Sequence, residues 1–210
     1  AKWNLAMDFY RNDRKTYRPT LLMGARKYTL TSMWTPFNYF GMQGVERIGN
    51  AERGDGAQGT RIKLTIGTRN SPKAWINPTG DELFNLSIRD IAFEGGSGTR
   101  WMAGTNPSSP TVLWCMHLNN VSFTGFRSVM GHMESTANDS KAFMNLCLID
   151  GWFSTNNCYT GAMHIGGSDN SLFMGMTNID SNMAYLDPAN AILDGDGKVV
   201  ALGHPHLWLD

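Results

Sequence analysis

Three carboxylates are the residues best suited to acid–base chemistry in this chain. Hydrolysis of a glycosidic bond needs two carboxyl groups, about 5 Å apart when the sugar configuration is retained and about 6.5 to 9.5 Å apart when it is inverted. Glu94 precedes a long Gly- and Ser-rich loop that contains Trp101, and Glu134 and Asp139 share one polar loop. We take Glu94, Glu134 and Asp139 as candidate catalytic residues, with ordinary loop carboxylates as the alternative.

Asp90 and Asp150 form a second candidate pair, because they occupy the same position in a repeated pattern. If strands stack at about 4.8 Å, residues two strands apart are about 9.6 Å apart, close to the spacing for inversion. Asn120 fills the position between them, and Asn178 continues it. This favours a structural stack of Asx side chains, which hydrogen-bond the main chain at a bend.

Histidines are the candidates for the other reaction on polysaccharides, in which a lyase base removes a proton beside a uronate carboxylate. His117 falls at an outward strand position and His164 precedes a pair of glycines, so each can face a groove, with a surface role as the alternative. His204 and His206 have strand-like spacing but no third ligand that we can nominate. We therefore expect no metal site and no cofactor.

Aromatic side chains are candidates for glycan contact, because sugar rings present apolar C–H faces that stack on Trp and Tyr. Trp101 and Tyr159 fall in expected loops, and Trp152 follows a bend at an outward position. Together with His117 they are the candidate glycan-binding residues. Trp114 falls at an inward position and is expected in the core.

A repeat of thirty residues positions all of these side chains. NLSIRDIAFEG (residues 85–95) is followed thirty residues later by CMHLNNVSFTG (115–125) and then by NLCLIDGWFST (145–155). A fourth copy, LFMGMTN (172–178), follows after 28 residues. Self-similarity at such a period indicates units that each bury an apolar face against their neighbours.

Apolar and polar residues alternate within each copy, which predicts strands with one buried face. Each strand stops at an Asx residue, which suits a bend into a second short strand. Repetition of strand, bend, strand and loop predicts an all-β, single-stranded parallel β-helix, with about 25 to 30 residues per coil and equivalent loops along one side. The expected inward columns are Leu86, Met116, Leu146; Ile88, Leu118, Leu148; and Phe93, Phe123, Phe153.

Composition limits the class of protein. The 210 residues are 41% apolar, and 18 basic residues balance 18 acidic ones, so a phosphate-binding surface and a nucleic-acid partner are not expected. Three cysteines argue against a disulfide framework and for assembly in a reducing compartment. No apolar run is long enough for membrane insertion and the first residues lack the plan of a signal peptide. We expect an N-terminal arm or lead-in segment at 1–19 and one β-helix domain at 20–210, as part of a longer chain.

Four short patterns occur in an order that resembles a known superfamily. LLMGARKYTL, FGMQGVERIG, GTRIKLTIG and LFNLSIRDIAFEG resemble the first coils of the pectate-lyase-like right-handed β-helix superfamily, in the form carried by bacteriophage tail spikes and tail-tip (minor tail) proteins. MGARKY departs from that pattern, because it lacks the usual proline and second glycine of the turn.

This resemblance implies a function as well as a handedness. It implies a homotrimer located in the virion, in the phage tail, after assembly in the host cytoplasm, with other phage tail proteins and host surface polysaccharide as partners. A structural and receptor-binding module for host glycan is the expected function. A glycan depolymerase, either a polysaccharide hydrolase or a lyase, is the alternative, and a secreted pectate-lyase-like enzyme is a third.

Overall fold

The structure, a computed structural model, describes residues 20–34, 38–45, 59–77, 82–103, 112–131, 142–158, 163–169, 172–181, 192–193, 199–201 and 207–209. All regular elements in these ranges are β-strands, so the predicted all-β class is confirmed. The expected N-terminal arm at 1–19 lies outside the described residues. No described segment forms a helix with the length and apolar character of a membrane span.

Two nine-stranded sheets contain most of the described strands, and nearly all of their pairings are parallel. Sheet A comprises β1 (Thr20–Leu22), β2 (Lys27–Leu30), β3 (Gly41–Gln43), β4 (Arg61–Leu64), β8 (Ser87–Glu94), β11 (His117–Thr124), β14 (Leu148–Cys158), β16 (Leu172–Phe173) and β17 (Met176–Ser181). Sheet B comprises β5 (Gly67–Thr68), β6 (Ser71–Ile76), β7 (Glu82–Phe84), β9 (Thr99–Met102), β10 (Val112–Trp114), β12 (Ser128–Met130), β13 (Ala142–Asn145), β15 (Met163–Asp169) and β20 (Leu207–Leu209). A separate two-stranded sheet is formed by the antiparallel pair β18 (Ile192–Leu193) and β19 (Val199–Ala201).

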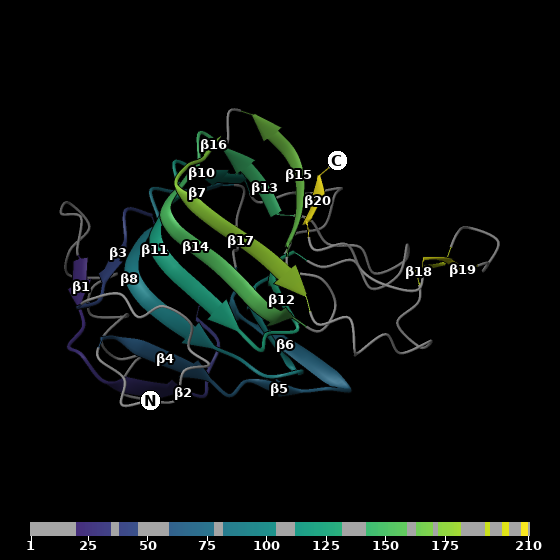
Figure 1. Cartoon of the computed structure of the whole chain (residues 1–210), viewed down its shortest axis with the longest axis horizontal. Coiled ribbons are helices and arrows are strands. Elements are labelled where there is room, and N and C mark those ends of the chain that lie inside the picture. Colours follow the sequence, from purple (N-terminus) through teal and green to yellow (C-terminus); the bar gives the residue numbers. More distant parts are fainter. Residues whose placement is uncertain are drawn as a thin grey trace.

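The chain passes between the sheets in the same order three times. β7, β8 and β9 are followed by β10, β11 and β12 and then by β13, β14 and β15, and each sheet A strand pairs in parallel with its predecessor (Figure 1). Between β8 and β11 the pairing follows the predicted interval of thirty residues, since Ile88 lies beside Leu118 and Phe93 beside Phe123. The repeat in the sequence is therefore a repeat of parallel strand pairing.

The third copy is displaced by one residue from the predicted alignment. Leu118 pairs with Ile149, which is 31 residues away. Because side chains alternate across a strand, a displacement of one residue exchanges the two faces. Cys147 and Ile149 are therefore buried, while Leu146 is 51% exposed and Leu148 is half-buried. The predicted inward positions of Leu146 and Leu148 are wrong.

A second irregularity, a β-bulge, lies within β14. The register shifts between Asn119 and Val121, so that Val121 pairs with Phe153, and Phe123 pairs with Thr155. Phe93 and Phe123 stack as predicted, with ring centroids 5.3 Å apart, but Phe153 is not in their column. A bulge adds one residue to one strand of a pair and leaves it without a counterpart.

The fourth copy is closer in sequence than predicted. Leu148 pairs with Leu172, which is 24 residues away, and Asn178 pairs with Ser154. Asn178 therefore does not continue the position of Asp150, and that prediction is wrong.

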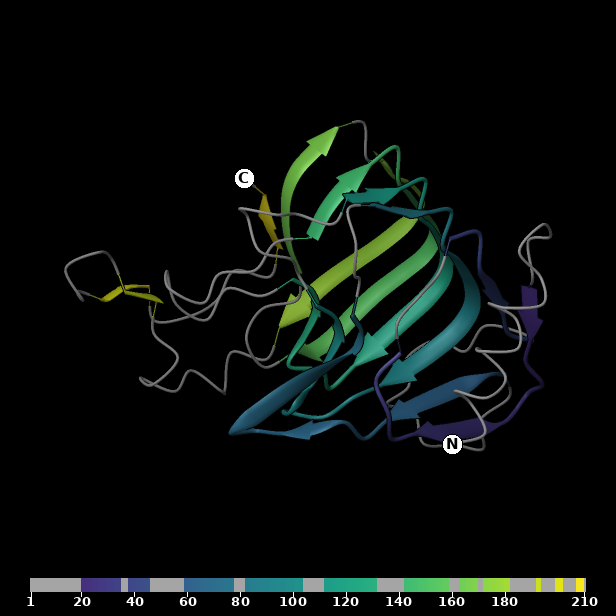
Figure 2. The ribbon, with the colours of Figure 1, turned by 180° about the vertical axis from the view of Figure 1, so that it is seen from behind.

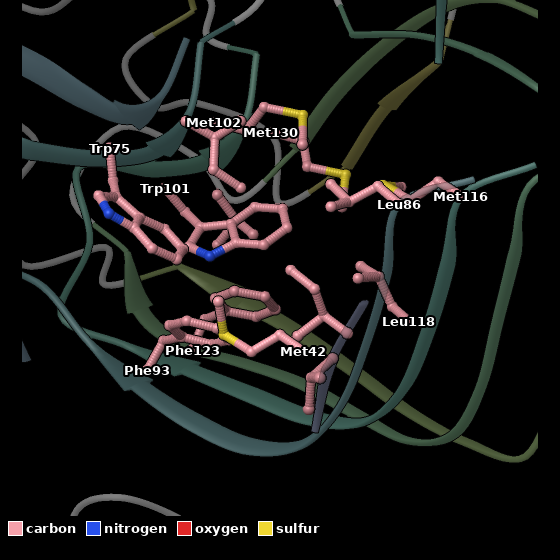
Figure 3. Close-up of a cluster of buried hydrophobic side chains, with 14 of the residues drawn as sticks. Met42, Trp75, Leu86, Phe93, Trp101, Met102, Met116, Leu118, Phe123 and Met130 are labelled. Atoms are coloured by element: carbon pink, nitrogen blue, oxygen red, sulfur yellow. The ribbon is translucent and has the colours of Figure 1, made fainter. Parts of the chain in front are cut away.

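The core lies between the two sheets and is aromatic at its centre. Trp101 on β9 is fully buried and packs edge-on against Phe93 and Phe123 at 5.7 and 4.9 Å between ring centroids (Figure 3). Figure 2 shows the sheet A strands from behind, curving around the interior that these side chains fill. The prediction of Trp101 as a loop residue that binds glycan is wrong. Trp114, expected in the core, is instead half-buried and stacks on Phe84.

The bend that divides each sheet A strand has a left-handed backbone. Asp90, Asn120, Gly151 and Gly175 have φ values of 58°, 50°, 65° and 82°. Asn, Asp and Gly are the residues that adopt this region most readily. Asp90 and Asn120 hold successive places in this column, and Gly151, not the predicted Asp150, holds the third.

Candidate functional site

Polar side chains gather on the outward face of sheet A beside this bend. Leu118 and Ile149 are buried, so the neighbouring His117, Asn119 and Asp150 lie on the opposite face of the sheet. His117 Nε2 lies 2.8 Å from Asp150 Oδ1, and Asn119 Nδ2 donates to the same oxygen at 2.6 Å. We call these three residues the outer polar cluster.

Asp150 is held as a carboxylate by its partners. Partial burial alone would raise the pKa of Asp150, but the side-chain hydrogen bonds from Asn119 and His117 and the charge of His117 outweigh it and lower that pKa below its usual value. The His117 and Asp150 side chains are 40% and 28% exposed. The cluster therefore presents an ionised acceptor within reach of solvent.

The Asx pair lies next to the cluster. Asn120 Nδ2 donates to Asp90 Oδ1 at 3.1 Å, and both residues are half-buried. The pair ends at Gly151, where an added Cβ would lie 2.5 Å from Asn120 Oδ1. The pairing places Asp150 beside Asn119 and Asp90 beside Asn120, in adjacent columns. The predicted alignment of Asp90 and Asp150 in one column, on which the alternative of a hydrolytic pair also depended, is therefore wrong.

Arg89 adds a cation to the same row. It pairs with Asn119, which pairs with Asp150, and its side chain is exposed. The outward face thus offers a guanidinium, an amide and a carboxylate on three successive strands. Sugar hydroxyls can both donate and accept hydrogen bonds, and these three groups together provide both donors and acceptors.

Glu94, the first candidate catalytic acid, has a different arrangement. Its Oε2 lies 2.6 Å from Lys27 Nζ, and its Oε1 lies 2.6 Å from Arg61 Nη2. Both carboxylate oxygens are therefore engaged by cations, which join β2 and β4 to the end of β8. This arrangement favours the structural alternative for Glu94.

The other predicted site residues are only partly placed. Trp152 lies in β14 at the bulge, and its backbone pairs with Met176. Glu134, Asp139 and Tyr159 lie outside the described residues.

Three residues of the site region, Arg89, Asn119 and Gly151, escaped prediction from the sequence. Asn119 was not singled out, because the interval of thirty placed Asp150 beside Asn120; an interval of 31 would have found it. Gly151 was not recognised as the third bend residue for the same reason. His164, expected to face a groove, is buried on β15.

The described residues contain no group of three or more His, Cys, Asp or Glu side chains that could hold a metal ion. Comparisons of the chain with protein-family models, with curated proteins and with solved structures find no match.

Proposed function

We propose that residues 20–210 form a right-handed, single-stranded parallel β-helix. Three observations support this architecture: the chain visits the two sheets in a repeated order, successive sheet A strands pair in parallel, and the left-handed residues Asp90, Asn120, Gly151 and Gly175 mark equivalent bends. Each coil then buries its apolar face against the next, as in other stacked repeats.

We propose further that the protein is a structural and receptor-binding module of a phage tail spike or tail tip, which contacts glycan on the host surface. The outer polar cluster carries this proposal, because its hydrogen-bonding groups are fixed by one another on a sheet. Binding groups held on strands keep their geometry better than groups on loops, so less entropy is lost when a ligand binds. The motif order supports a location in the virion, assembly in the host cytoplasm, a homotrimeric state, and contact of that homotrimer with other phage tail proteins.

Binding is tested by passing the full chain over a panel of immobilised bacterial capsule and cell-wall polysaccharides. We expect at least one polysaccharide to retain the protein. Asp150→Asn should bind it about tenfold more weakly, because hydrogen bonds to an ionised acceptor are stronger than those to a neutral one. Lys73→Gln is the control, since Lys73 is exposed on β6 of the other sheet.

Two results contradict this proposal. If no polysaccharide retains the wild-type protein, glycan binding is wrong. If Asp150→Asn and Lys73→Gln bind as wild type does, glycan binding stands but the outer polar cluster is not its site.

A glycan depolymerase of the lyase type is the second candidate. The contact of His117 with Asp150 favours it, because a carboxylate that holds an imidazole is the usual support for a histidine base. Incubation with the retained polysaccharide should then produce unsaturated uronate absorbance, and His117→Gln should abolish it. If the polysaccharide retains the protein but incubation produces neither this absorbance nor new reducing ends, the depolymerase is wrong and the binding module stands.

A further inference from the structure

Residues 142–150, with the sequence AFMNLCLID, contain two alternating sets of apolar side chains, and each set suits the interior. The structure buries the first set, which is Met144, Cys147 and Ile149. The second set is Phe143, Leu146 and Leu148. A displacement of one residue, to the interval of thirty residues that holds between β8 and β11, would exchange the two sets. The apolar pattern therefore does not choose between these two registers.

The observed register places Leu146 unfavourably. Leu146 has a φ of 51°, and its side chain is 51% exposed. Asn85 and Cys115 hold this position in the two preceding copies, each with φ 54°. A left-handed backbone is more unfavourable for a large apolar residue than for Asn. In the displaced register Asn145 would take the left-handed position and Leu146 would be buried, so both disadvantages would be removed.

Polar contacts and a glycine favour the observed register. Asp150 Oδ1 accepts a hydrogen bond from Asn119 Nδ2 and lies 2.8 Å from His117 Nε2. Gly151 takes the bend with φ 65°, which glycine adopts without strain. In the displaced register Asp150 would take the bend, and Asp also tolerates a left-handed backbone. Each register therefore has advantages that the other lacks.

The pairing around this segment is already irregular. Two residues, Gly151 and Trp152, lie opposite Asn120 in the bulge that follows the segment. The pairing of β13 with β15 also shifts its register, between Phe143 and Asn145. Bulges admit an unpaired residue into one strand. A bulge larger by one residue would let 142–150 move while the rest of β14 stays in place.

We propose that residues 142–150 exchange between the observed register and one displaced by one residue, and that this exchange assembles and dissolves the outer polar cluster. In the displaced register Cys147 lies beside His117 on the outward face, and Asp150 lies beside Asn120. The contacts of Asp150 with Asn119 and His117 are then lost. Two packings of one sequence that differ little in free energy make a two-state switch.

A ligand that binds only one of two states shifts the population toward that state. Glycan bound at the outer polar cluster therefore holds the observed register. This effect rests on the function proposed above, whereas the exchange itself depends only on strand pairing.

Cys147 reports the register of the segment. Its thiol is buried in the observed register, where it donates to the Leu113 carbonyl at 3.2 Å. Burial raises the pKa of the Cys147 thiol, so iodoacetamide should react with it slowly in this register. The displaced register turns the thiol outward, where it should react faster.

Alkylation of the native full chain tests the exchange, with the modified cysteine located by fragmentation of its peptide in a mass spectrometer. We expect wild-type Cys147 to react at a rate that changes little in low concentrations of urea, because the displacement exposes little new surface. Reaction through global unfolding would instead accelerate steeply with urea, since that route exposes the whole core.

Two variants should move the rate in opposite directions. Leu146→Asn should slow the reaction about tenfold, because Asn suits the exposed left-handed position and is unfavourable in the interior. Gly151→Ala should speed it about tenfold, because it strains the bend of the observed register only. Gly67→Ala is the matched control, since Gly67 has φ 76° and its added Cβ would lie 2.6 Å from the Gly98 carbonyl oxygen, but in β5, which pairs with β6. This control should speed only the reaction that depends on urea.

Three results overturn the proposal. The first is a rate for wild-type Cys147 that rises with urea as steeply as global unfolding does. The second is a Leu146→Asn variant that reacts as fast as wild type. The third is equal acceleration by Gly151→Ala and Gly67→Ala. If Gly151→Ala does not fold, the urea dependence and Leu146→Asn decide the question.

Retention on polysaccharide separates this inference from the proposed function. If the alkylation rates follow the expected pattern but no polysaccharide retains the wild-type protein, the exchange stands and glycan binding is wrong. If a polysaccharide retains the protein but the rates do not follow that pattern, glycan binding stands and the exchange is wrong. If both are correct, a saturating amount of the retained polysaccharide should slow the alkylation of Cys147.

Discussion

The pairing of β8 with β11 is regular, whereas the pairing of β11 with β14 is displaced by one residue and then bulged. The regular pair stacks phenylalanine on phenylalanine and Asn120 beside Asp90. The irregular pair moves Asp150 out of the bend and beside Asn119, where its carboxylate also meets His117. The polar cluster therefore arises where the repeat is broken, since an unbroken repeat would have put Asp150 at the bend.

Truncation of a core side chain of the regular pair should cause the largest loss in the free energy of unfolding. Phe123→Ala removes a ring that packs on Phe93, Trp101 and Phe126 and leaves a cavity. We expect a loss of about 3 to 5 kcal/mol in the free energy of unfolding, measured by urea denaturation. Phe84→Ala is the control, because the Phe84 ring is half-buried and faces outward. This variant should lose distinctly less free energy of unfolding. Equal losses would show that the core does not depend on this column.

In the irregular pair, substitution of the bend residue Gly151 should destabilise the fold most. Gly151→Ala places a Cβ at positive φ and 2.5 Å from Asn120 Oδ1. We expect it to destabilise the fold by about 1 to 3 kcal/mol. Gly96→Ala is the control, since a Cβ there meets nothing within 4 Å. A variant as stable as this control would mean that the bend does not need glycine.

The displacement also predicts a stabilising substitution. Leu146→Asn should raise the free energy of unfolding by about 0.5 to 1 kcal/mol, because Asn tolerates φ 51° better than Leu. Leu148→Asn is the comparison, because Leu148 is half-buried and pairs with His117. This variant should lower the free energy of unfolding. The measurement is thermal unfolding at a protein concentration where the chain is monomeric. A destabilised Leu146→Asn would contradict the assigned backbone.

The smallest expected effect is the pH dependence contributed by Asp150. Its pKa is lower in the folded chain than in the unfolded chain, so its interactions stabilise the fold above the unfolded pKa of about 3.9. That stabilisation is lost as the pH falls through the folded value. The difference in unfolding free energy between wild type and Asp150→Asn should therefore shrink on acidification from pH 6 to pH 3. A difference independent of pH would contradict the lowered pKa.

The sequence predicted the regular pair correctly and failed where two residue types fit one position. Phe93 and Phe123, or Asp90 and Asn120, align without ambiguity. In LCLI (146–149) both alternating sets are apolar, so periodicity cannot decide whether Leu146 or Cys147 faces inward. Only the strand pairing decides it.

Trp101 shows a different failure. Its Gly- and Ser-rich surroundings predict a loop, whereas residues 99–102 form a strand that pairs with both β6 and β12. Local composition carries no information about partners that are distant in the sequence. Burial of a large ring between two such partners outweighs the weak local preference.

The ion pairs of Glu94 have a consequence for biosynthesis. Lys27 and Glu94 are 67 residues apart, and chains grow at about 5 to 20 residues per second. Lys27 is therefore translated several seconds before Glu94, the residue whose carboxylate forms an ion pair with it. β2 therefore has to wait for a segment translated later to complete its sheet, which exposes it to chaperones and to pairing with neighbouring nascent chains.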